Sequence, residues 1–378
     1  MKVVIAMDSF KGSMSSMEAG NAAKAGIEKA CNAKVVVKPL ADGGEGTTEA
    51  LVEGLGGRFV TAEVTGAPGK KVTVKYGILQ DNKTAIMEMA EAAGITLAKQ
   101  EELNPLTATT YGVGEMILDA LKRGCRKFMI GIGGSMTSEG GVGMLQALGA
   151  EILLQDGCFA TPGIQDLDRI ASINTKNMPK ELQDCHFQIA CDVKNPLCGE
   201  NGAVYVFGAQ KGIRKEQKAL FDKKMAYFAD KTKEYTGKDY RTEAGAGAAG
   251  GLGFAFLSYF EKVELKPGID IVLDAIGLEQ EIKDADIVIT GEGLLDSQTA
   301  MGKAPAGVAC LAKKYGVMVL ALAGGVTKEA VVCNAIGIDA FFPIVRGITT
   351  REEAMKKENA KENMTLAAEQ VFRLLQLS

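Results

Sequence analysis

The stretch MKVVIAMDSFKGSMSSMEAGNAAKAGIEKACNAKVVVKPLADGGEG (residues 1–46) opens the chain and predicts its fold class. Residues 2–7 form a short apolar run that is typical of a buried strand, and Ser15–Glu18 forms a capping box that begins a helix. Residues 35–38 form a second strand, and a glycine-rich loop then opens a helix through Leu55. This repeated strand–loop–helix order predicts an α/β fold with a parallel sheet, whose loops lie at the carboxyl ends of the strands.

The pattern changes after the first roughly 65 residues and changes back near the C-terminus. Alternating segments (FVTAEV, KVTVKYGIL and TAIMEM) are separated by turn signals and predict an antiparallel meander. Strand–helix alternation resumes with DIVIT and continues to an amphipathic C-terminal helix. We therefore predict a discontinuous parallel βα domain from residues 1–65 and 280–378, with residues 66–279 inserted as a mixed α/β domain.

Composition argues against several classes of protein. The chain has 378 residues, a formal net charge of −4, no tryptophan and no basic stripe, so a nucleic-acid partner is not expected. No run is long and apolar enough to predict a membrane span, and the opening residues lack a signal-peptide core. The eight cysteines include no C-x-x-C pair, which favours reduced thiols and a cytoplasmic location. Because His186 is the single histidine, a general base is expected to be a carboxylate.

The segment DSFKGS (residues 8–13) directly follows the first strand. Its lysine, Lys11, lies beside a glycine and hydroxyl groups, one of them from Ser9, and this arrangement suits an anionic group at a helix N-terminus. Asp8 could orient that lysine or hold a metal. A capped helix start with a solvated lysine explains the segment equally well.

The segment ADGGEGT follows the second strand and is dense in carboxylates and glycines. Close like charges raise one another's pKa unless a cation or a donor offsets them. We therefore predict that Asp42, Gly43, Gly44 and Glu45 bind substrate, with Asp42 and Glu45 as candidate Mg²⁺ ligands. Helix capping by the two carboxylates is the alternative.

Two further loops follow strands in the predicted inserted domain. GIGGSMTSEGG (residues 131–141) opens a helix, so the N–H groups of Gly133, Gly134 and Ser135 could form an anion-binding nest, although the Walker A element G-K-[ST] is missing. In CDVKNPL, Asp192 follows the strand FQIA, where α/β enzymes keep catalytic groups. Asp192 is the first choice for general base, and an Asx-turn is the alternative.

The last two glycine-rich segments differ in what they predict. GAGAAGG (residues 245–251) satisfies G-x-G-x-x-G, but no strand precedes it, so a tight loop that caps the next helix and is approached by nucleotide or substrate is favoured over a dinucleotide site. TGEGLLDSQT (residues 290–299) follows a strand and suits Mg²⁺ and phosphate handling. Here we single out Gly293 and Lys303 for phosphate and Asp296 for the metal.

Taken together, these segments resemble the glycerate kinase type I family. Its members carry a DSFKGS-like start, an ADGGEGT loop, a GGSxTxxGG segment, a CDVxNPL turn, a GAGAAGGLG loop and a TGEGxxDxQTxxGKxPxGVA block, all present here in this order. TTYGVGE (residues 109–115) resembles a further family segment. The chain departs from the family at Ser138-Glu139, where members commonly carry Asn-Asp, so Glu139 is left out of the predicted site.

The resemblance implies a flavodoxin-like βα domain with an inserted mixed α/β domain, and ATP-dependent phosphorylation of D-glycerate, usually to 2-phosphoglycerate. It implies ATP and Mg²⁺ as cofactors, with D-glycerate and Mg-ATP bound in the cleft between the domains. A homo-oligomer is possible. We expect Asp192 to accept the glycerate hydroxyl proton and Lys11 to neutralise the glycerate carboxylate or the transferring phosphate. The Gly133–Ser135 nest and Lys303 would cradle phosphates.

Two functions from other classes remain as alternatives at this stage. An NAD(P)-dependent oxidoreductase would be built on residues 245–250, and the missing strand before that loop argues against it. A non-catalytic metabolite sensor would bind glycerate or nucleotide without turnover, and the dense carboxylates at strand ends argue against it.

Overall fold

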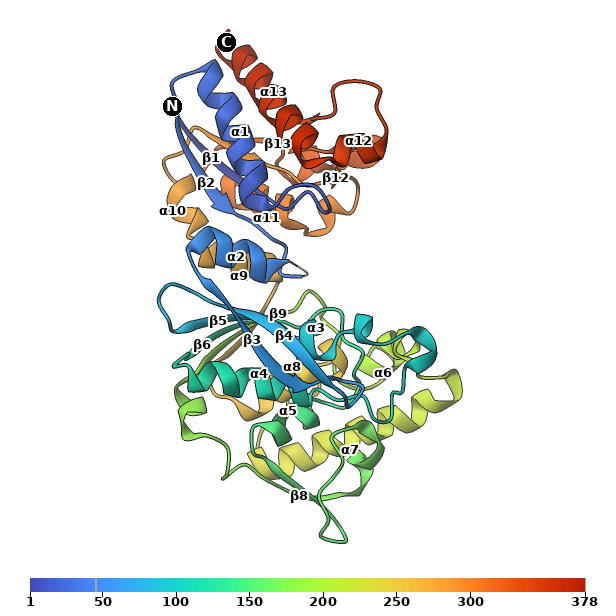
Figure 1. Cartoon of the computed structure of the whole chain (residues 1–378). Coiled ribbons are helices and arrows are strands. Elements are labelled where there is room, and N and C mark those ends of the chain that lie inside the picture. Colours follow the sequence, from blue (N-terminus) through green and yellow to red (C-terminus); the bar gives the residue numbers. More distant parts are fainter. Residues whose placement is uncertain (45, 378) are drawn as a thin grey trace. The chain divides into compact units, whose positions relative to one another are not determined.

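The structure is a computed structural model that describes residues 1–44 and 46–377 (Figure 1). Contacts within it divide the chain into two compact units. Unit 1 comprises Met1–Gly57 and Ile269–Ser378, and unit 2 comprises Arg58–Gly268. Each unit has a sheet and a core of its own, and each is described here by itself.

The boundaries between the units differ from the predicted ones at 65/66 and 279/280. Strand β3 (Arg58–Thr65) hydrogen-bonds along its whole length with β4 (Lys71–Ile78), so it belongs to unit 2. At the second boundary, α10 (Leu278–Ile282) belongs to unit 1, where Lys2 Nζ donates to Glu281 O at 2.8 Å. The boundaries are therefore set by the pairing of β3 with β4 and by the hydrogen bond between Lys2 and α10.

The sheet of unit 1 has five parallel strands in the order β15-β13-β11-β1-β2. Their bounds are β1 (Lys2–Met7), β2 (Lys34–Pro39), β11 (Ile287–Thr290), β13 (Met318–Ala323) and β15 (Ala340–Pro343). Counted along unit 1, this is the order 2-1-3-4-5 of flavodoxin-like folds, which confirms the predicted fold class. Residues 3–7 of β1 are fully buried, because a central parallel strand is covered on both faces.

The helices of unit 1 begin with the predicted capping box. Glu18 N donates to Ser15 Oγ (3.3 Å) and Ser15 N donates to Glu18 Oε2 (3.2 Å). The helix bounds are α1 (Ser16–Ala30), α2 (Thr47–Leu55), α9 (Gly268–Ala275), α11 (Ala304–Lys313), α12 (Arg351–Met355) and α13 (Lys357–Leu375). Helix α13 lies beside α1 (Figure 1), and Gly26 permits this close approach, since a Cβ there would lie 2.0 Å from Thr365 O. The C-terminal helix thus completes the core against the first helix.

The sheet of unit 2 has six strands in the order β10-β9-β6-β5-β4-β3. The further bounds are β5 (Thr84–Glu88), β6 (Lys127–Gly131), β9 (His186–Ala190) and β10 (Val263–Lys266). The predicted meander is confirmed, because β4 pairs antiparallel with both β3 and β5. Strands β5, β6, β9 and β10 are parallel, so the loops that follow them begin at one edge of the sheet.

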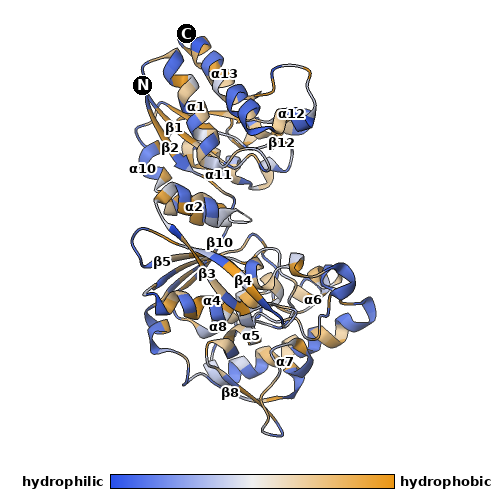
Figure 2. Ribbon diagram, viewed as in Figure 1, coloured by the Kyte–Doolittle hydropathy of each residue, from blue (hydrophilic) through white to orange (hydrophobic). Residues whose placement is uncertain are grey.

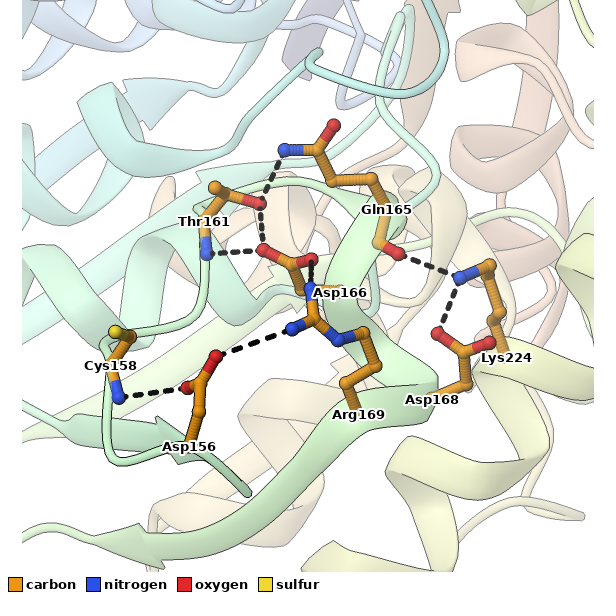
Figure 3. A network of polar contacts seen from close by, with 8 residues as sticks. All are labelled: Asp156, Cys158, Thr161, Gln165, Asp166, Asp168, Arg169 and Lys224. Atoms are coloured by element: carbon orange, nitrogen blue, oxygen red, sulfur yellow. Dashed lines mark hydrogen bonds and ion pairs between the residues drawn. The ribbon is translucent and has the colours of Figure 1, made fainter.

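Helices cover the sheet of unit 2, and a hairpin that the sequence did not predict lies beside the longest of them. The helix bounds are α3 (Ala90–Ala93), α4 (Tyr111–Lys122), α5 (Val142–Ala147), α6 (Ala203–Phe207), α7 (Lys218–Thr236) and α8 (Leu252–Tyr259), and the hairpin is β7 (Glu151–Leu154) with β8 (Ile170–Asn174). A polar network ties α7 to the turn before β8 (Figure 3): Lys224 Nζ donates to Gln165 O at 2.6 Å and pairs with Asp168.

Hydropathy differs sharply between the strands and some of the helices (Figure 2). Strand β1 is coloured as apolar, whereas the short α10 is largely polar. Across the described residues, no helix combines the length and the apolar character that a membrane span requires.

Candidate functional site

The predicted loops of unit 1 meet at the carboxyl edge of its parallel sheet. Between β1 and β11 the order of the strands changes direction, with β2 on one side and β13 and β15 on the other. Open α/β sheets bind ligands at such a switch point. A cavity of about 830 Å³ lies there. Its wall includes Asp8, Ser9 and Lys11 after β1, Asp42 after β2, Glu292, Gly293, Asp296 and Lys303 after β11, Gly324 after β13, and Ile344 after β15. Residues from all five strand ends therefore share one cavity.

Three carboxylates near the switch point repel one another. Burial raises the pKa of Asp8 to about 7, and the charges of Asp42 and Glu292 act in the same direction, against the Ser9 N–H and the charge of Lys11. Ser9 N donates to Asp8 Oδ1 at 2.6 Å. A carboxyl group that binds a proton near neutral pH is a group that a bound cation would stabilise in its charged form.

Glu292 connects this carboxylate group to the loop that carries Lys303. Its Oε1 accepts a hydrogen bond from Thr299 Oγ1 (2.6 Å), and its Oε2 lies 3.9 Å from Lys303 Nζ. Burial raises the pKa of Glu292, and the Thr299 bond and the Lys303 charge oppose that rise. Asp296 Oδ1 lies 3.6 Å from the same Lys303 Nζ. Lys303 is therefore held between two carboxylates at the cavity wall.

Cations that lack a carboxylate partner also line the cavity. Within residues 1–44 and 46–377, neither Lys11 nor Arg351 forms an ion pair, and Arg351 Nε contacts only Met355 Sδ, at 3.4 Å. Ser13 Oγ is buried at the same wall with no hydrogen-bond partner among these residues. An anionic ligand would satisfy all three groups.

The glycine-rich loop after β2 is positioned by its own aspartate. Gly44 N donates to Asp42 Oδ1 at 2.8 Å, which is an Asx-turn, and Gly43 has a φ of +91° that favours glycine. Asp42 thereby reaches the cavity wall, with Gly43 and Gly44 following it. The predicted ligand Glu45 lies outside the described residues.

The donor set of the cavity fits Mg²⁺ held jointly with a ligand. Mg²⁺ prefers oxygen ligands and is commonly bound by one or two carboxylates together with substrate phosphates. Asp42 and Asp296, both predicted for this role, line the cavity, and Asp8 and Glu292 add further carboxylates there. Within the described ranges, no group of three His, Cys, Asp or Glu could hold a metal ion by itself. Phosphate oxygens would have to complete the coordination.

The predicted anion-binding nest lies in unit 2, after β6. Gly133 and Gly134 are exposed, and Gly134 has a φ of +70°. In the described part of the chain, the N–H groups of Gly133, Gly134 and Ser135 donate to no backbone acceptor. The nest is therefore open to an oxyanion, while the Ser135 side chain is buried beneath it.

Asp192 lies after β9, the strand next to β6, so its loop begins beside the nest loop. Its Oδ1 accepts a hydrogen bond from Gly268 N at 3.0 Å, where α9 begins. The alternative of a local Asx-turn is not what the structure shows, because the donor is Gly268, the last residue of unit 2 and far along the chain from Asp192. The other oxygen, Oδ2, has no protein partner among the described residues, and the side chain is exposed.

The buried loop 245–251 holds the other two loops of unit 2 in place. Gly247 N donates to Asn195 O (2.9 Å) in the CDVKNPL segment, and a Cβ at Gly250 would lie 2.0 Å from Thr137 O in the nest segment. The expectation that nucleotide or substrate approaches this loop stays a prediction, and the space where a Cβ would lie is filled by protein backbone at Gly247 and Gly250. The same packing leaves no place for a dinucleotide on G-x-G-x-x-G.

Sequence reasoning missed several residues of these two sites. Glu292 was visible in the TGEG loop, but only the structure shows that it faces Asp8 and Lys303. Arg351 reaches the cavity from α12, far along the chain. Glu139, left out of the prediction, is buried and accepts bonds from Thr110 N (3.2 Å) and Gly143 N (2.9 Å), so it joins the starts of α4 and α5.

Replacing Asp8 by asparagine should change the pH dependence of stability. Because the pKa of Asp8 is about 7 in the folded protein and ordinary when unfolded, the folded state binds the extra proton between about pH 4 and 7. Folding stability of the wild type is therefore lost as pH rises through that window, by about 4 kcal/mol at most. Asp8→Asn removes this loss, so its thermal midpoint should exceed that of the wild type at pH 8 and match it at pH 4.5. An equal difference at both pH values would contradict the assignment.

The family model, the related sequences and the solved structure that match this chain all belong to the same family. The model of the glycerate kinase family matches residues 3–376. The glycerate kinase of Bacillus subtilis (strain 168) is 43% identical over 379 residues, covering 100% of this chain and 98% of the relative. The glycerate 2-kinase of Escherichia coli (strain K12) is 42% identical over 372 residues, covering 98% and 97%. A crystal structure from Salmonella typhimurium LT2, provisionally named glycerate kinase 2, aligns with a TM-score of 0.91 at 42% identity, covering 100% and 98%.

Proposed function

The chain belongs to the glycerate kinase family, and from that premise we propose that it transfers the γ-phosphoryl group of ATP to D-glycerate, forming 2-phosphoglycerate. The observation that carries the proposal is the cavity at the switch point of unit 1. It combines carboxylates that a cation would stabilise with Lys11 and Arg351, two cations that form no ion pair among residues 1–44 and 46–377. Phosphoryl transfer needs this combination, since its main requirements are positioning and neutralisation of charge.

The residues of unit 1 would handle the charged groups of the substrates. Lys11 would neutralise the glycerate carboxylate or the transferring phosphoryl group, and Lys303 would contact phosphate oxygens once a ligand competes with its carboxylate neighbours. Asp42 and Asp296 would hold Mg²⁺. When bound, the metal would neutralise charge that develops on the phosphoryl oxygens.

The residues of unit 2 would supply the base and an oxyanion site. Asp192 Oδ2 has no protein partner among the described residues and could accept the proton from the 2-hydroxyl group of glycerate. The open N–H groups of the Gly133–Ser135 nest would bind a phosphate or carboxylate oxygen.

An assay of ADP release tests the proposal. Purified protein with ATP, Mg²⁺ and D-glycerate should release ADP at a rate that depends on both the acceptor and the metal. Matched reactions contain L-glycerate, glycolate or lactate in place of D-glycerate, and EDTA in place of Mg²⁺. ADP release that does not depend on D-glycerate would contradict the proposal, because it would indicate hydrolysis or a different acceptor.

Replacing Lys11 by methionine should weaken catalysis through lost charge neutralisation. We expect kcat/KM for D-glycerate to fall by about tenfold to a thousandfold, with little change in stability, because the side chain is exposed at the cavity wall. Lys24→Met, which removes a partly exposed lysine on α1 that pairs with Glu28, is the matched control and should leave kcat/KM unchanged. Wild-type kinetics for Lys11→Met would remove Lys11 from the site.

A further inference from the structure

Lys211 is a buried lysine that pairs with no carboxylate among the described residues. It ends the short turn η5 (Ala209–Lys211), and its exposed fraction is 2%. Its Nζ donates to Ser135 Oγ and to Thr137 O, both at 2.7 Å. Among the described residues, no Asp or Glu lies within ion-pair distance of Nζ. Both hydrogen-bond acceptors belong to the segment that carries the nest.

Burying an ammonium group lowers the stability of the folded protein, so its presence calls for interactions that an apolar side chain could not make. Taking the charge out of water lowers the pKa of Lys211 to about 7, against the opposing influence of Glu139. Methionine has a similar length and would fill the same space without that penalty. The interactions of the ammonium group with the nest segment are therefore the feature that needs an explanation.

The two hydrogen bonds hold the nest segment at Ser135 and Thr137, on either side of Met136, whose N–H donates to Ala93 O (3.0 Å). On the side before Ser135, Ile95 N donates to Gly134 O (2.8 Å), and further along the segment Gly140 N donates to Gly250 O (2.9 Å). Lys211 ties down the stretch between these bonds, from beneath the exposed nest. Without it, the backbone between residues 134 and 140 would lose its tie from η5.

The bond to Ser135 also sets the direction in which its hydroxyl donates. While Lys211 is protonated it can only donate, so Ser135 Oγ then accepts from it, and the O–H proton of Ser135 is left for another acceptor. No protein acceptor for that proton is found in the described part of the chain. An oxyanion bound in the nest could accept it together with the backbone N–H groups.

We propose that Lys211 is a positioning residue, which holds the segment 133–137 in its anion-binding conformation and makes Ser135 a hydrogen-bond donor to that anion. The anion is an oxyanion of a substrate, either a phosphate of ATP or the carboxylate of glycerate, so the proposal rests on the proposed function. The KM values for ATP and for D-glycerate, measured separately, show which of the two substrates supplies the bound anion.

The test compares Lys211→Met with Lys224→Met. Lys224 is a second largely buried lysine of unit 2, and its ammonium binds Gln165 O and Asp168 (Figure 3), neither of which belongs to the nest segment. We expect Lys211→Met to raise KM for ATP or for D-glycerate by about tenfold or more, with a thermal midpoint equal to or above that of the wild type. Lys224→Met should lower the midpoint, because it leaves Asp168 without its partner, and should leave both KM values unchanged.

Hydrogen exchange gives a readout that does not depend on activity. The amide of Gly140 donates to Gly250 O at the far end of the nest segment, and its exchange should accelerate by about tenfold or more in Lys211→Met and stay unchanged in Lys224→Met. If the wild type released no ADP, the proposed function would fail, while faster exchange in Lys211→Met would still support the positioning role. Unchanged exchange together with unchanged KM values would overturn the inference.

Ser135→Ala keeps the inference testable if Lys211→Met does not fold. It removes the Ser135 hydroxyl, which both accepts from Lys211 and is the proposed donor to the anion, and it leaves the ammonium group of Lys211 bound to Thr137 O. We expect it to raise KM for the same substrate, and the double variant to be no worse than the more affected single one, because the two residues act as a unit. Wild-type KM values for Ser135→Ala would overturn the donor role.

Discussion

Asp192→Asn is expected to lower kcat by about a hundredfold or more, which is the range for loss of a general base. The structure makes this a clean test. Asparagine keeps the side-chain oxygen that accepts the bond from Gly268 N at 3.0 Å, so the start of α9 stays capped. What it removes is the basicity of the other oxygen, which has no protein partner among the described residues. Stability and substrate KM values should therefore change little.

Asp222→Asn is the matched control for this variant. Asp222 also accepts a backbone bond in unit 2, from Gly199 N at 3.0 Å, and lines no site described above. It should keep wild-type kcat. If Asp192→Asn also kept wild-type kcat, another group would have to take the proton, and Asp192 would be only a cap for α9.

Gly250→Ala should destabilise unit 2 by about 4 kcal/mol or more, and it could prevent folding altogether. A Cβ at this position would lie 2.0 Å from Thr137 O and 2.6 Å from Ser138 Cα, which are parts of a packed segment. Gly250 also has a φ of +66°, which disfavours any residue with a Cβ. Urea unfolding of the purified variant would measure the loss.

Gly237→Ala separates the steric effect from the backbone effect. Gly237 has a φ of +73° at the end of α7, and a Cβ there would meet nothing within 4 Å. This variant should lose only about 1 kcal/mol, the ordinary penalty for a Cβ in the left-handed region. Equal losses for the two variants would contradict the account of loop 245–251 as a packing element.

Much of the fold could be predicted because parallel strands buried on both faces leave continuous apolar runs. Residues 3–7 and 287–290 are of this kind, and loops that follow such strands necessarily lie at one edge of the sheet. The boundary at residue 57 could not be predicted, because β3 belongs to unit 2 only through its pairing with β4. The hairpin of β7 and β8 was missed because its short strands are separated by an irregular segment.

The residues of the candidate sites could be singled out where they lie in the loop just after a strand, as Asp8, Asp42 and Asp192 do. They were not predictable where tertiary packing brings a residue in from elsewhere, as with Arg351 on α12. Lys211 did carry a signal, since it is the only charged residue between 202 and 213, in a mostly apolar stretch with glycines at 202, 208 and 212. The glycines of loop 245–251 suggest ligand binding by their pattern, yet they are required by contacts with two other loops.

Phosphorus NMR of the product formed from ATP and D-glycerate tests the central claim most directly. In 2-phosphoglycerate the ester phosphorus is coupled to a single methine proton, so its resonance should be a doublet. A triplet would show that the phosphoryl group is on the terminal hydroxyl, which carries two methylene protons. The account predicts the doublet, together with the two resonances of ADP. A triplet, or inorganic phosphate in place of an ester, would contradict it.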